Sequence, residues 1–233
     1  MELTLSSSPV LEEPSPFAAS RAANVEMRRV TLREEWDQVR SLRYLALRSR
    51  GDIPERRDAR FGDEHDEVPN AMTFLLTEGV RPVGTTRSSV GRSSEPGSLP
   101  AGAAFGREIE AAVGSEATAV EASLSFVDAE FAGDPRAALV HLFKAQILVC
   151  ALEGADWLLA AVAESRIGFY RRVFDMEILS GPEICPGRLA PSVLMGMNVR
   201  RHLAMLVRRM PDIAVTDADH AAFVATGRIL LAR

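Results

Sequence analysis

The spacing of apolar residues changes abruptly near the middle of the chain. Residues 119–127 (AVEASLSFV) form a strand-like segment, and residues 139–150 then carry apolar side chains at helical intervals. Between them, Asp134 and Pro135 are typical of an N-cap and of a first helical position, so a long helix is predicted to begin there. A strand that leads into a helix N-terminus offers free N–H groups and a positive dipole end, which suit a phosphate or a developing oxyanion.

Strand patterns continue after this helix. Residues 156–163 (DWLLAAVA) are a continuous apolar run typical of a central buried strand. Strand, helix and strand in this order predict a right-handed βαβ unit whose two strands are parallel neighbours. Beyond it we expect a short helix, two more strands and two C-terminal helices; these cover residues 164–174, 176–179, 192–199, 200–210 and 216–231.

The N-terminal half begins with residues 1–24, which are rich in Ser, Pro, Ala and Glu and predict a flexible arm. Thr31 and Glu34 have the spacing of a capping box, and the helical pattern that follows predicts an amphipathic helix ending by Gly51. Its other face carries several arginines, which an ordinary solvated flank would also explain.

Charge and turn residues divide the next segment. Residues 52–70 are polar and interrupted by prolines, which predicts an irregular loop. Two strand patterns around Gly79 predict a β-hairpin, residues 88–104 predict a second loop, and residues 105–113 predict a short helix.

Composition narrows the class of protein. A chain of 233 residues with 47% hydrophobic content can bury one domain, and a net charge of −5 does not favour nucleic acid or an anionic membrane. The sequence shows neither an apolar run of membrane-spanning length nor a signal peptide, so we expect no integral membrane span and a cytoplasmic location. Cys150 and Cys185 have no metal-ligand spacing and are interpreted as buried or incidental thiols.

Five short motifs occur in an order that resembles one family. They are Arg43-Tyr44, Asp63-Glu64-His65-Asp66, Val83-Gly84-Thr85-Thr86-Arg87, Glu121-Ala122-Ser123 and Phe169-Tyr170-Arg171-Arg172-Val173-Phe174. Together they resemble the GNAT-type N-acyltransferases, and within them the acyl-homoserine-lactone synthases and long-chain N-acyl amino acid synthases. The resemblance implies an α/β (α+β) fold: a three-layer α/β/α sandwich with a central mixed sheet and a splayed parallel strand pair. It implies an acyltransferase domain over residues 25–198 and a C-terminal helical extension over residues 199–233 that packs on it.

Two positions depart from the family pattern. Leu124 stands where the family motif E-x-S-R-F has arginine. The loop before the long helix keeps only Gly133 and Arg136 of the pyrophosphate-binding R-x-x-G-x-G sequence found in relatives that use acetyl-CoA. This loop favours a donor on acyl carrier protein, because a protein-bound phosphopantetheine arm has no adenosine diphosphate to bind.

Polar residues on the strand over residues 119–127 are the first candidates for chemistry. Strict alternation places Glu121, Ser123 and Ser125 on one face, and a polar stripe on a central strand needs partners or a water-lined cleft. Glu121 is therefore our candidate for binding or deprotonating an acceptor amine. The alternative is a buried ion pair with Arg87 or Arg43, and both roles are compatible since such a pair keeps the carboxylate ionised.

Aminolysis of a thioester also needs a donor for the oxyanion and a proton for the departing sulfur. We expect the backbone N–H groups of Val127, Asp128 and Ala129 to serve the oxyanion. Tyr170, on the short helix after the second strand, is expected to protonate the sulfur; packing against the sheet is the alternative.

The charged loop supplies candidates for the acceptor. Asp63 and Asp66 suit an ammonium group, and Arg43 or Arg87 suits a carboxylate, because a guanidinium fork matches carboxylate geometry. An exposed charged loop without function is the alternative. His65 is a candidate proton relay or an incidental histidine. No metal site is predicted.

Two groups of residues outside the motifs, one basic and one apolar, each have two possible roles. Lys144, Arg166, Arg171, Arg172 and the pairs Arg200-Arg201 and Arg208-Arg209 are either a docking patch for an acidic carrier protein or ordinary surface charge. The methionines and leucines over residues 195–206 either line an acyl tunnel or pack in the core.

The resemblance implies an N-acyltransferase that moves a medium or long acyl chain from acyl carrier protein to the amine of an amino acid or similar small molecule. It implies no permanently bound cofactor, with acyl-phosphopantetheine or acyl-CoA as co-substrate. The alternatives are an acetyl-CoA-dependent acetyltransferase, a lactone-forming signal synthase, and a non-catalytic acyl-binding or regulatory protein on the same fold.

Overall fold

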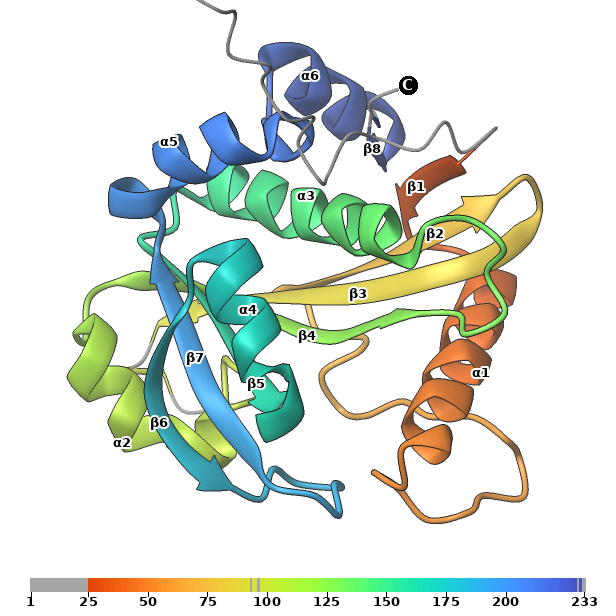
Figure 1. The fold of residues 1–233 in the computed structure, drawn as a ribbon, viewed down its shortest axis with the longest axis horizontal. Helices are drawn as coiled ribbons and strands as arrows, with labels where there is room; N and C mark the ends of the chain where they lie inside the picture. Colours follow the sequence, from red (N-terminus) through yellow and green to blue (C-terminus); the bar gives the residue numbers. More distant parts are fainter. Residues whose placement is uncertain (1–24, 93, 96, 230, 232–233) are drawn as a thin grey trace, which may run out of the picture.

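One mixed sheet of eight strands organises the described part of the chain (Figure 1). The computed structural model describes residues 25–92, 94–95, 97–229 and 231; the arm expected over residues 1–24 lies outside them. The strand order is β6-β7-β5-β4-β3-β2-β1-β8. The strands are β1 (Val25–Arg29), β2 (Ala71–Glu78), β3 (Arg81–Arg92), β4 (Thr118–Val127), β5 (Trp157–Ala163), β6 (Glu177–Glu183), β7 (Ser192–Asn198) and β8 (Arg228–Ile229).

Helices cover both faces of this sheet, which confirms the three-layer architecture (Figure 1). The α-helices are α1 (Arg33–Ser49), α2 (Gly102–Val113), α3 (Pro135–Glu153), α4 (Ile167–Phe174), α5 (Val199–Arg209) and α6 (Asp217–Thr226). The main core lies on the face covered by α3 and α4, where the rings of Phe143 and Phe174 stack with centroids 3.9 Å apart. Separate apolar clusters pack under α1 and α2 on the other face.

The helix α3 begins where the sequence predicts. The Asp134 side chain accepts a hydrogen bond of 2.8 Å from the N–H of Arg136, and Pro135 occupies the first turn. By length and composition, α3 is apolar enough to cross a membrane, although no segment was predicted to be so from the sequence. However, 67% of the relevant window is buried inside the structure, as expected for a helix that packs on a sheet.

The parallel pair β4 and β5 separates soon after it forms. The two strands are in register from Ala119 opposite Trp157 to Glu121 opposite Leu159, and the pairing ends there. The predicted βαβ unit with a splayed strand pair is therefore confirmed. Glu121 lies at the point where the gap between the strands opens.

A β-bulge in β4 changes which of its side chains share a face of the sheet. The register with β3 passes from Ser123 opposite Arg87 to Phe126 opposite Thr85, so Leu124 and Ser125 together oppose the single residue Thr86. Leu124 has a positive φ of 51°, which reverses the alternation at this point. The prediction that Ser125 shares a face with Glu121 and Ser123 is wrong, because strict alternation cannot include an extra residue.

Several local boundaries also differ from the prediction. Glu35, not Glu34, caps α1: its carboxylate accepts hydrogen bonds of 3.0 and 3.1 Å from the N–H groups of Thr31 and Leu32. Residues 88–92 extend β3, and they are not part of a loop. The last helix ends at Thr226 and does not reach residue 231, because Gly227 adopts a left-handed conformation with φ of 68°.

The strands β1 and β8 at one end of the sheet were not predicted. Each is short, and β8 has only two residues, so neither offers enough alternation to be recognised from sequence. The C-terminal segment is thus not purely helical: β8 pairs with β1, and Lys144 of α3 forms a buried ion pair of 2.9 Å with Asp219 of α6.

Candidate active site

A cleft of about 440 Å³ opens beside the start of the β4–β5 separation. Its lining comes from the loop after α1, the start of α2 and the residues before it, the strands β3, β4 and β5, and the connection between β6 and β7 together with the first residue of β7. The lining side chains with chemical potential are Arg56, Asp63, Glu64, His65, Arg87, Glu121, Ser123, Cys185, Arg188 and Ser192. Leu124 lines the same cleft, because the bulge turns its side chain in this direction.

Glu121 is the buried acid of this cleft. Only 2% of the residue is exposed, and its Oε2 accepts a hydrogen bond of 2.7 Å from the backbone N–H of Ala101. Burial raises the pKa of Glu121 to about 7, although the Ala101 N–H and the charge of Arg87 act in the opposite direction. A carboxyl group with this pKa can accept and release a proton near neutral pH.

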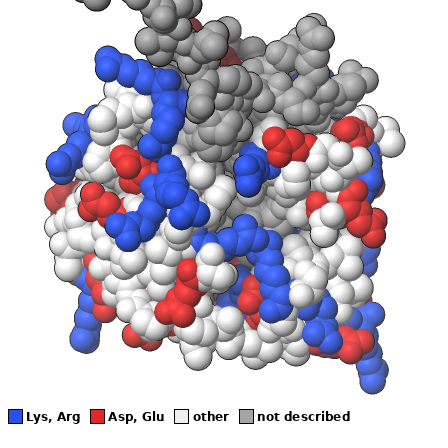
Figure 2. All heavy atoms as spheres, in the orientation of Figure 1, with Lys and Arg blue, Asp and Glu red and all other residues white. Residues whose placement is uncertain are grey.

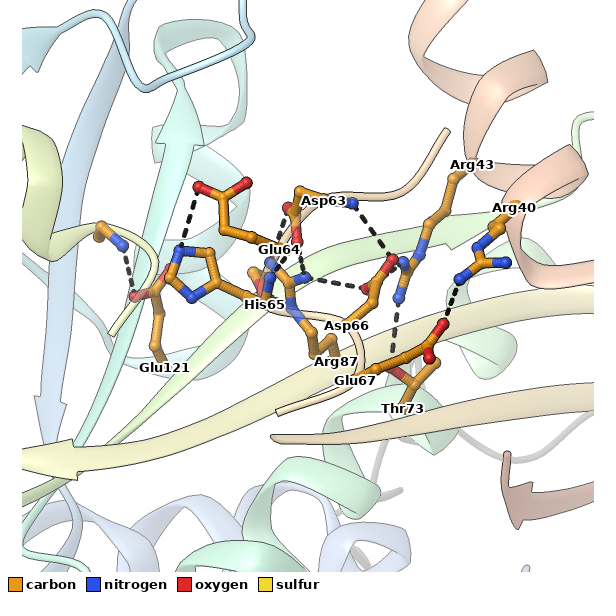
Figure 3. A network of polar contacts seen from close by, with 12 residues as sticks. Arg40, Arg43, Asp63, Glu64, His65, Asp66, Glu67, Thr73, Arg87 and Glu121 are labelled. Atoms are coloured by element: carbon orange, nitrogen blue, oxygen red, sulfur yellow. Dashed lines mark hydrogen bonds and ion pairs between the residues drawn. The ribbon is translucent and has the colours of Figure 1, made fainter. Parts of the chain in front are cut away.

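An ion network connects the charged loop to β3 and α1 (Figure 3). Arg43 donates to Asp66 at 2.6 Å, and Arg87 donates to Asp66 at 2.9 Å and to both carboxylate oxygens of Asp63. Burial acts to raise the pKa of Asp63, but the hydrogen bonds and charge of Arg87 outweigh it and lower that pKa. Asp63 therefore stays ionised, and the network holds the loop against the sheet.

The structure brings the four predicted acceptor-binding residues together but gives them different positions. Arg43 and Asp66 are almost fully buried and do not line the cleft, while Asp63 and Arg87 do. Both guanidinium groups already bind carboxylates of the protein. In this arrangement Arg43 has no contact with the cleft, and Asp63 is the acidic network member with an exposed edge.

The two candidate serines lie on opposite sides of the sheet. Ser123 faces the cleft, and its Oγ accepts a hydrogen bond of 3.0 Å from Nε of Arg87. Ser125 faces α3, where its Oγ lies 2.7 Å from Oγ1 of Thr86 and accepts from Gln146 at 3.1 Å. Ser125 therefore has no contact with the acceptor cleft.

His65 lies at the edge of the network. Its backbone N–H donates to Asp63 at 3.0 Å, and its Nε2 is 3.9 Å from Glu64 (Figure 3). Since its ring lines the cleft together with Glu121, the geometry permits the predicted relay without requiring it.

The predicted donor-binding residues lie outside this cleft. Val127, Asp128 and Ala129 line a separate cavity of about 760 Å³ against α1. The N–H of Asp128 already donates to the carbonyl of Val83 at 2.8 Å, and its carboxylate pairs with Arg81 at 2.7 Å. Asp128 thus has no free N–H for an oxyanion, because this part of β4 still pairs with β3.

Gly133 and Arg136 lie farther along, at the entry to α3. Arg136 is exposed, and a Cβ added at position 133 would collide with the ring of Phe131. Glycine is therefore needed here for packing, whether or not a phosphate binds.

Tyr170 lies on α4, half-buried against the edges of Phe169 and Phe174. Burial raises the pKa of Tyr170, and the charges of Arg166 and Arg50 partly oppose this. Its hydroxyl therefore stays protonated at neutral pH and is close to two arginines. Tyr170 does not line the cleft of Glu121, so the two proposed proton-transfer groups are not brought together there.

We call the two arginines near Tyr170, Arg50 and Arg166, the arginine pair. The guanidinium of Arg50 lies over the ring of Phe126 at 5.1 Å, and burial followed by the charge of Arg166 lowers the pKa of Arg50. In the described part of the chain no carboxylate lies within ion-pair distance of either guanidinium. Figure 2 shows basic side chains gathered across the middle of this face, over α4 and the nearby end of α1.

Other predicted basic and apolar groups have structural roles. Lys144 is buried in its ion pair with Asp219, so it is not part of a docking patch. Met195, Met197 and Leu206 are buried in the main core, as the packing alternative expected.

Sequence reasoning missed Arg56 and the wall of the cleft that holds Cys185, Arg188 and Ser192. This wall is formed by the connection between β6 and β7 and the first residue of β7, more than 60 residues beyond Glu121 in the chain. Only the tertiary fold places this connection over the cleft. The proline and glycine residues around Cys185 indicated a loop but gave no sign of its position.

The splayed sheet with helices on both faces and a cleft at the splay defines the class of GNAT-like acyltransferases. A family model described as "N-acyl amino acid synthase FeeM" matches residues 38–198, well over half of the chain. The chain therefore belongs to this family of N-acyl amino acid synthases, and N-acyltransferase activity is the activity of the class. A comparison with curated proteins finds no match.

Solved structures show the same fold. FeeM, an N-acyl amino acid synthase from uncultured soil microbes, is 20% identical with a TM-score of 0.65, covering 80% of this chain and 97% of FeeM. BjaI, a CoA-dependent acyl-homoserine lactone synthase, is 20% identical with a TM-score of 0.59, covering 86% of this chain and 100% of BjaI. A putative N-acetyltransferase from Lactobacillus plantarum is 15% identical with a TM-score of 0.51, covering 75% of this chain and 98% of its own.

Proposed function

We propose that this protein transfers a medium or long acyl chain from acyl carrier protein to the amine of an amino acid or similar small molecule. The observation that carries the proposal is Glu121, a buried carboxyl group with a pKa of about 7 in a cleft at the strand separation. Aminolysis of a thioester requires a free amine, and a base of this pKa can generate it at neutral pH.

In the proposed reaction the acceptor enters the cleft as an ammonium ion. The carboxylates of Asp63 and Glu121 attract it, and Glu121 takes one proton. The amine nitrogen then attacks the thioester carbonyl carbon, forming the C–N bond, and the C–S bond breaks as the tetrahedral intermediate collapses. Glu121 holds the first proton until product leaves, and the nitrogen loses its second proton to solvent as the amide forms. Tyr170 gives its proton to the departing sulfur and recovers one from solvent, so the products are the amide, the free thiol and one released proton.

The donor is proposed to enter from the face where β4 and β5 separate. The arginine pair lies on that face next to Tyr170 and has no ion-pair partner among the described residues. Unpaired guanidinium groups suit the phosphate of a phosphopantetheine arm and the acidic surface of a carrier protein. The poor glycine content of the loop before α3 favours acyl carrier protein over coenzyme A.

The test is a side-by-side assay with long-chain acyl carrier protein, the same acyl group on coenzyme A, and acetyl-CoA, each with a panel of amino acids. We expect the highest kcat/KM with the carrier protein. A higher kcat/KM with the long acyl-CoA would contradict acyl carrier protein as the donor. A higher kcat/KM with acetyl-CoA would also contradict the proposed length of the acyl chain. Absence of any amide product, with correctly folded enzyme, would contradict the whole proposal.

A further inference from the structure

Arg188 is a second charged group in the cleft of Glu121. It lies in the connection between β6 and β7, and its Nη2 donates to the carboxylate of Asp52 at 2.9 Å. The neighbouring N–H of Leu189 donates to the carbonyl of Asp52 at 2.9 Å. Two bonds to one buried residue thus fix this connection over the end of α1.

The guanidinium of Arg188 is not fully used by these contacts. Its Nε is buried and has no hydrogen-bond partner, although leaving a buried N–H without an acceptor is unfavourable. Such an unsatisfied donor on a cleft wall calls for an acceptor that the protein does not supply.

The other two arginines that line the cleft are less suitable for a ligand. Arg87 donates to Asp63, Asp66 and Ser123, so four of its five N–H groups are already used by the protein. Arg56 is largely exposed at the rim, near Asp58. Arg188 is therefore the guanidinium of the described cleft that combines partial burial with a free donor.

The cleft therefore holds carboxylates together with a guanidinium that has a free donor. Glu121 and Asp63 supply the carboxylates from β4 and the loop after α1, and Arg188 comes from the connection between β6 and β7. The thiol of Cys185 is affected by both charges: burial and then the charge of Glu121 raise its pKa, and Arg188 acts in the opposite direction. A small molecule with an amine and a carboxylate matches this distribution.

We propose that Arg188 binds the carboxylate of the acceptor, with Asp52 holding the guanidinium in position, so that the acceptor is an amino acid presented with its amine toward Glu121. This inference rests on the proposed function, and it adds the residue that selects acceptors with a carboxylate. It replaces Arg43 and Arg87, which the sequence indicated for this role.

The first experiment compares an accepted amino acid with its carboxamide in wild-type enzyme and in Arg188→Met and Arg188→Lys. We expect the wild type to favour the amino acid, and Arg188→Met to lose about 10- to 100-fold in kcat/KM for the amino acid, as for a hydrogen-bonded charge. The carboxamide rate should change little, and Arg188→Lys should retain part of the preference. Arg107→Met, an exposed arginine on α2 outside the cleft, is the control.

The second experiment needs no acyl donor. Cys185 lines the cleft, whereas burial raises the pKa of Cys150 to about 12, so a maleimide should label Cys185 selectively at pH 8. The amino acid should protect Cys185 in the wild type and in Arg107→Met but not in Arg188→Met. The melting temperature of each variant reports whether it is folded.

The outcomes separate the two proposals. Protection that depends on Arg188 in an enzyme that forms no amide would support the carboxylate site and contradict the proposed function. Amide formation with an unchanged preference for the amino acid in folded Arg188→Met and Arg188→Lys would overturn the role of Arg188 alone. Equal protection of Cys185 in wild type and Arg188→Met would also overturn it.

Discussion

Ser123 and Ser125 are two residues apart on β4 but point to opposite faces of the sheet. Ser123 accepts a hydrogen bond from Arg87, whereas Ser125 contacts Thr86 and Gln146 under α3. Because Thr86 and Arg87 are consecutive residues of β3, their side chains lie on opposite faces. The bulge between the two serines brings Leu124 onto the cleft face beside Glu121.

Leu124→Arg should shift the pH dependence of the reaction. A guanidinium at this cleft position favours the ionised form of Glu121 and lowers its pKa. We expect the midpoint of the kcat–pH profile to move below its wild-type value, which Glu121 places near 7. Leu124→Met, which adds no charge, should leave the midpoint in place. A profile of Leu124→Arg that coincides with the wild type would show that Glu121 does not control the rate.

Glu121→Gln should greatly reduce turnover while preserving the fold. The amide cannot accept the proton of the acceptor, so we expect kcat to fall about 10²- to 10⁴-fold, the usual contribution of a positioned base. The carbonyl oxygen of glutamine can still accept the hydrogen bond from Ala101. Single-turnover rates with saturating donor and acceptor measure this effect, and a rate within twofold of wild type would exclude Glu121 as the base.

The same substitution should stabilise the protein in alkaline solution. The pKa of Glu121 rises from 4.5 to about 7 on folding, so its favourable contribution is complete below pH 4.5 and is lost as the pH rises through 7. A shift of this size corresponds to at most about 3 kcal/mol at pH 8. Urea unfolding at pH 4 and pH 8 should therefore show Glu121→Gln gaining stability over the wild type only at the higher pH.

Asp66→Asn should destabilise the protein far more than Asp63→Asn. Asp66 is buried between Arg43 and Arg87, and removing its charge leaves two buried guanidinium groups poorly compensated, at a cost of about 3–5 kcal/mol. The Asp63 side chain is 27% exposed and lines the cleft, so its replacement should mainly raise the KM for the acceptor. Equal losses in unfolding free energy would contradict this division of roles.

Structural features that depend on residues close together in the chain could be predicted from the sequence. The cap at Asp134 and the apolar run over residues 156–163 were enough to predict α3 and the parallel pair of β4 and β5. The motif residues Asp63, Arg87 and Glu121 were likewise placed in one region, and the cleft includes all three.

Features that depend on tertiary pairing were not predictable. The bulge at Leu124 arises from the register with β3, and alternation along one strand cannot reveal it. The sequence indicated Arg43 and Arg87 for a substrate carboxylate, but their partners Asp63 and Asp66 come from a loop whose path is set by the fold. Arg188 lines the cleft of Glu121 only because the connection between β6 and β7 folds back to Asp52.

Tyr170→Phe should slow release of the sulfur without disturbing packing. The ring contacts with Phe169 and Phe174 remain, and only the hydroxyl is lost. Since the pKa of Tyr170 is raised above its ordinary value of 10, the hydroxyl is protonated throughout a neutral assay. We expect kcat to fall about 10²-fold. Tyr44→Phe, which removes the other tyrosine hydroxyl of the chain, is the control, and equal rates in both variants would exclude Tyr170 as the acid.

Charge reversal of the arginine pair should weaken binding of a carrier-bound donor. Arg50→Glu and Arg166→Glu each replace an unpaired cation with an anion next to the proposed entry of the phosphopantetheine arm. We expect each variant to raise the KM for acyl carrier protein roughly tenfold, which corresponds to about 1.4 kcal/mol. The KM for the amino acid should not change, because the acceptor binds in the separate cleft of Glu121.

Measuring the KM for acyl carrier protein at several salt concentrations tests whether the arginine pair attracts the donor by its charge. The KM of the wild type for acyl carrier protein should rise with salt, and the dependence should be weaker in both variants, since fewer attractive charges remain to be screened. Arg107→Glu carries the same change of net charge on α2, away from the arginine pair, and should keep the wild-type salt dependence. If Arg107→Glu raises the KM as much as Arg50→Glu and Arg166→Glu, the effect comes from net charge and the donor does not bind at the arginine pair.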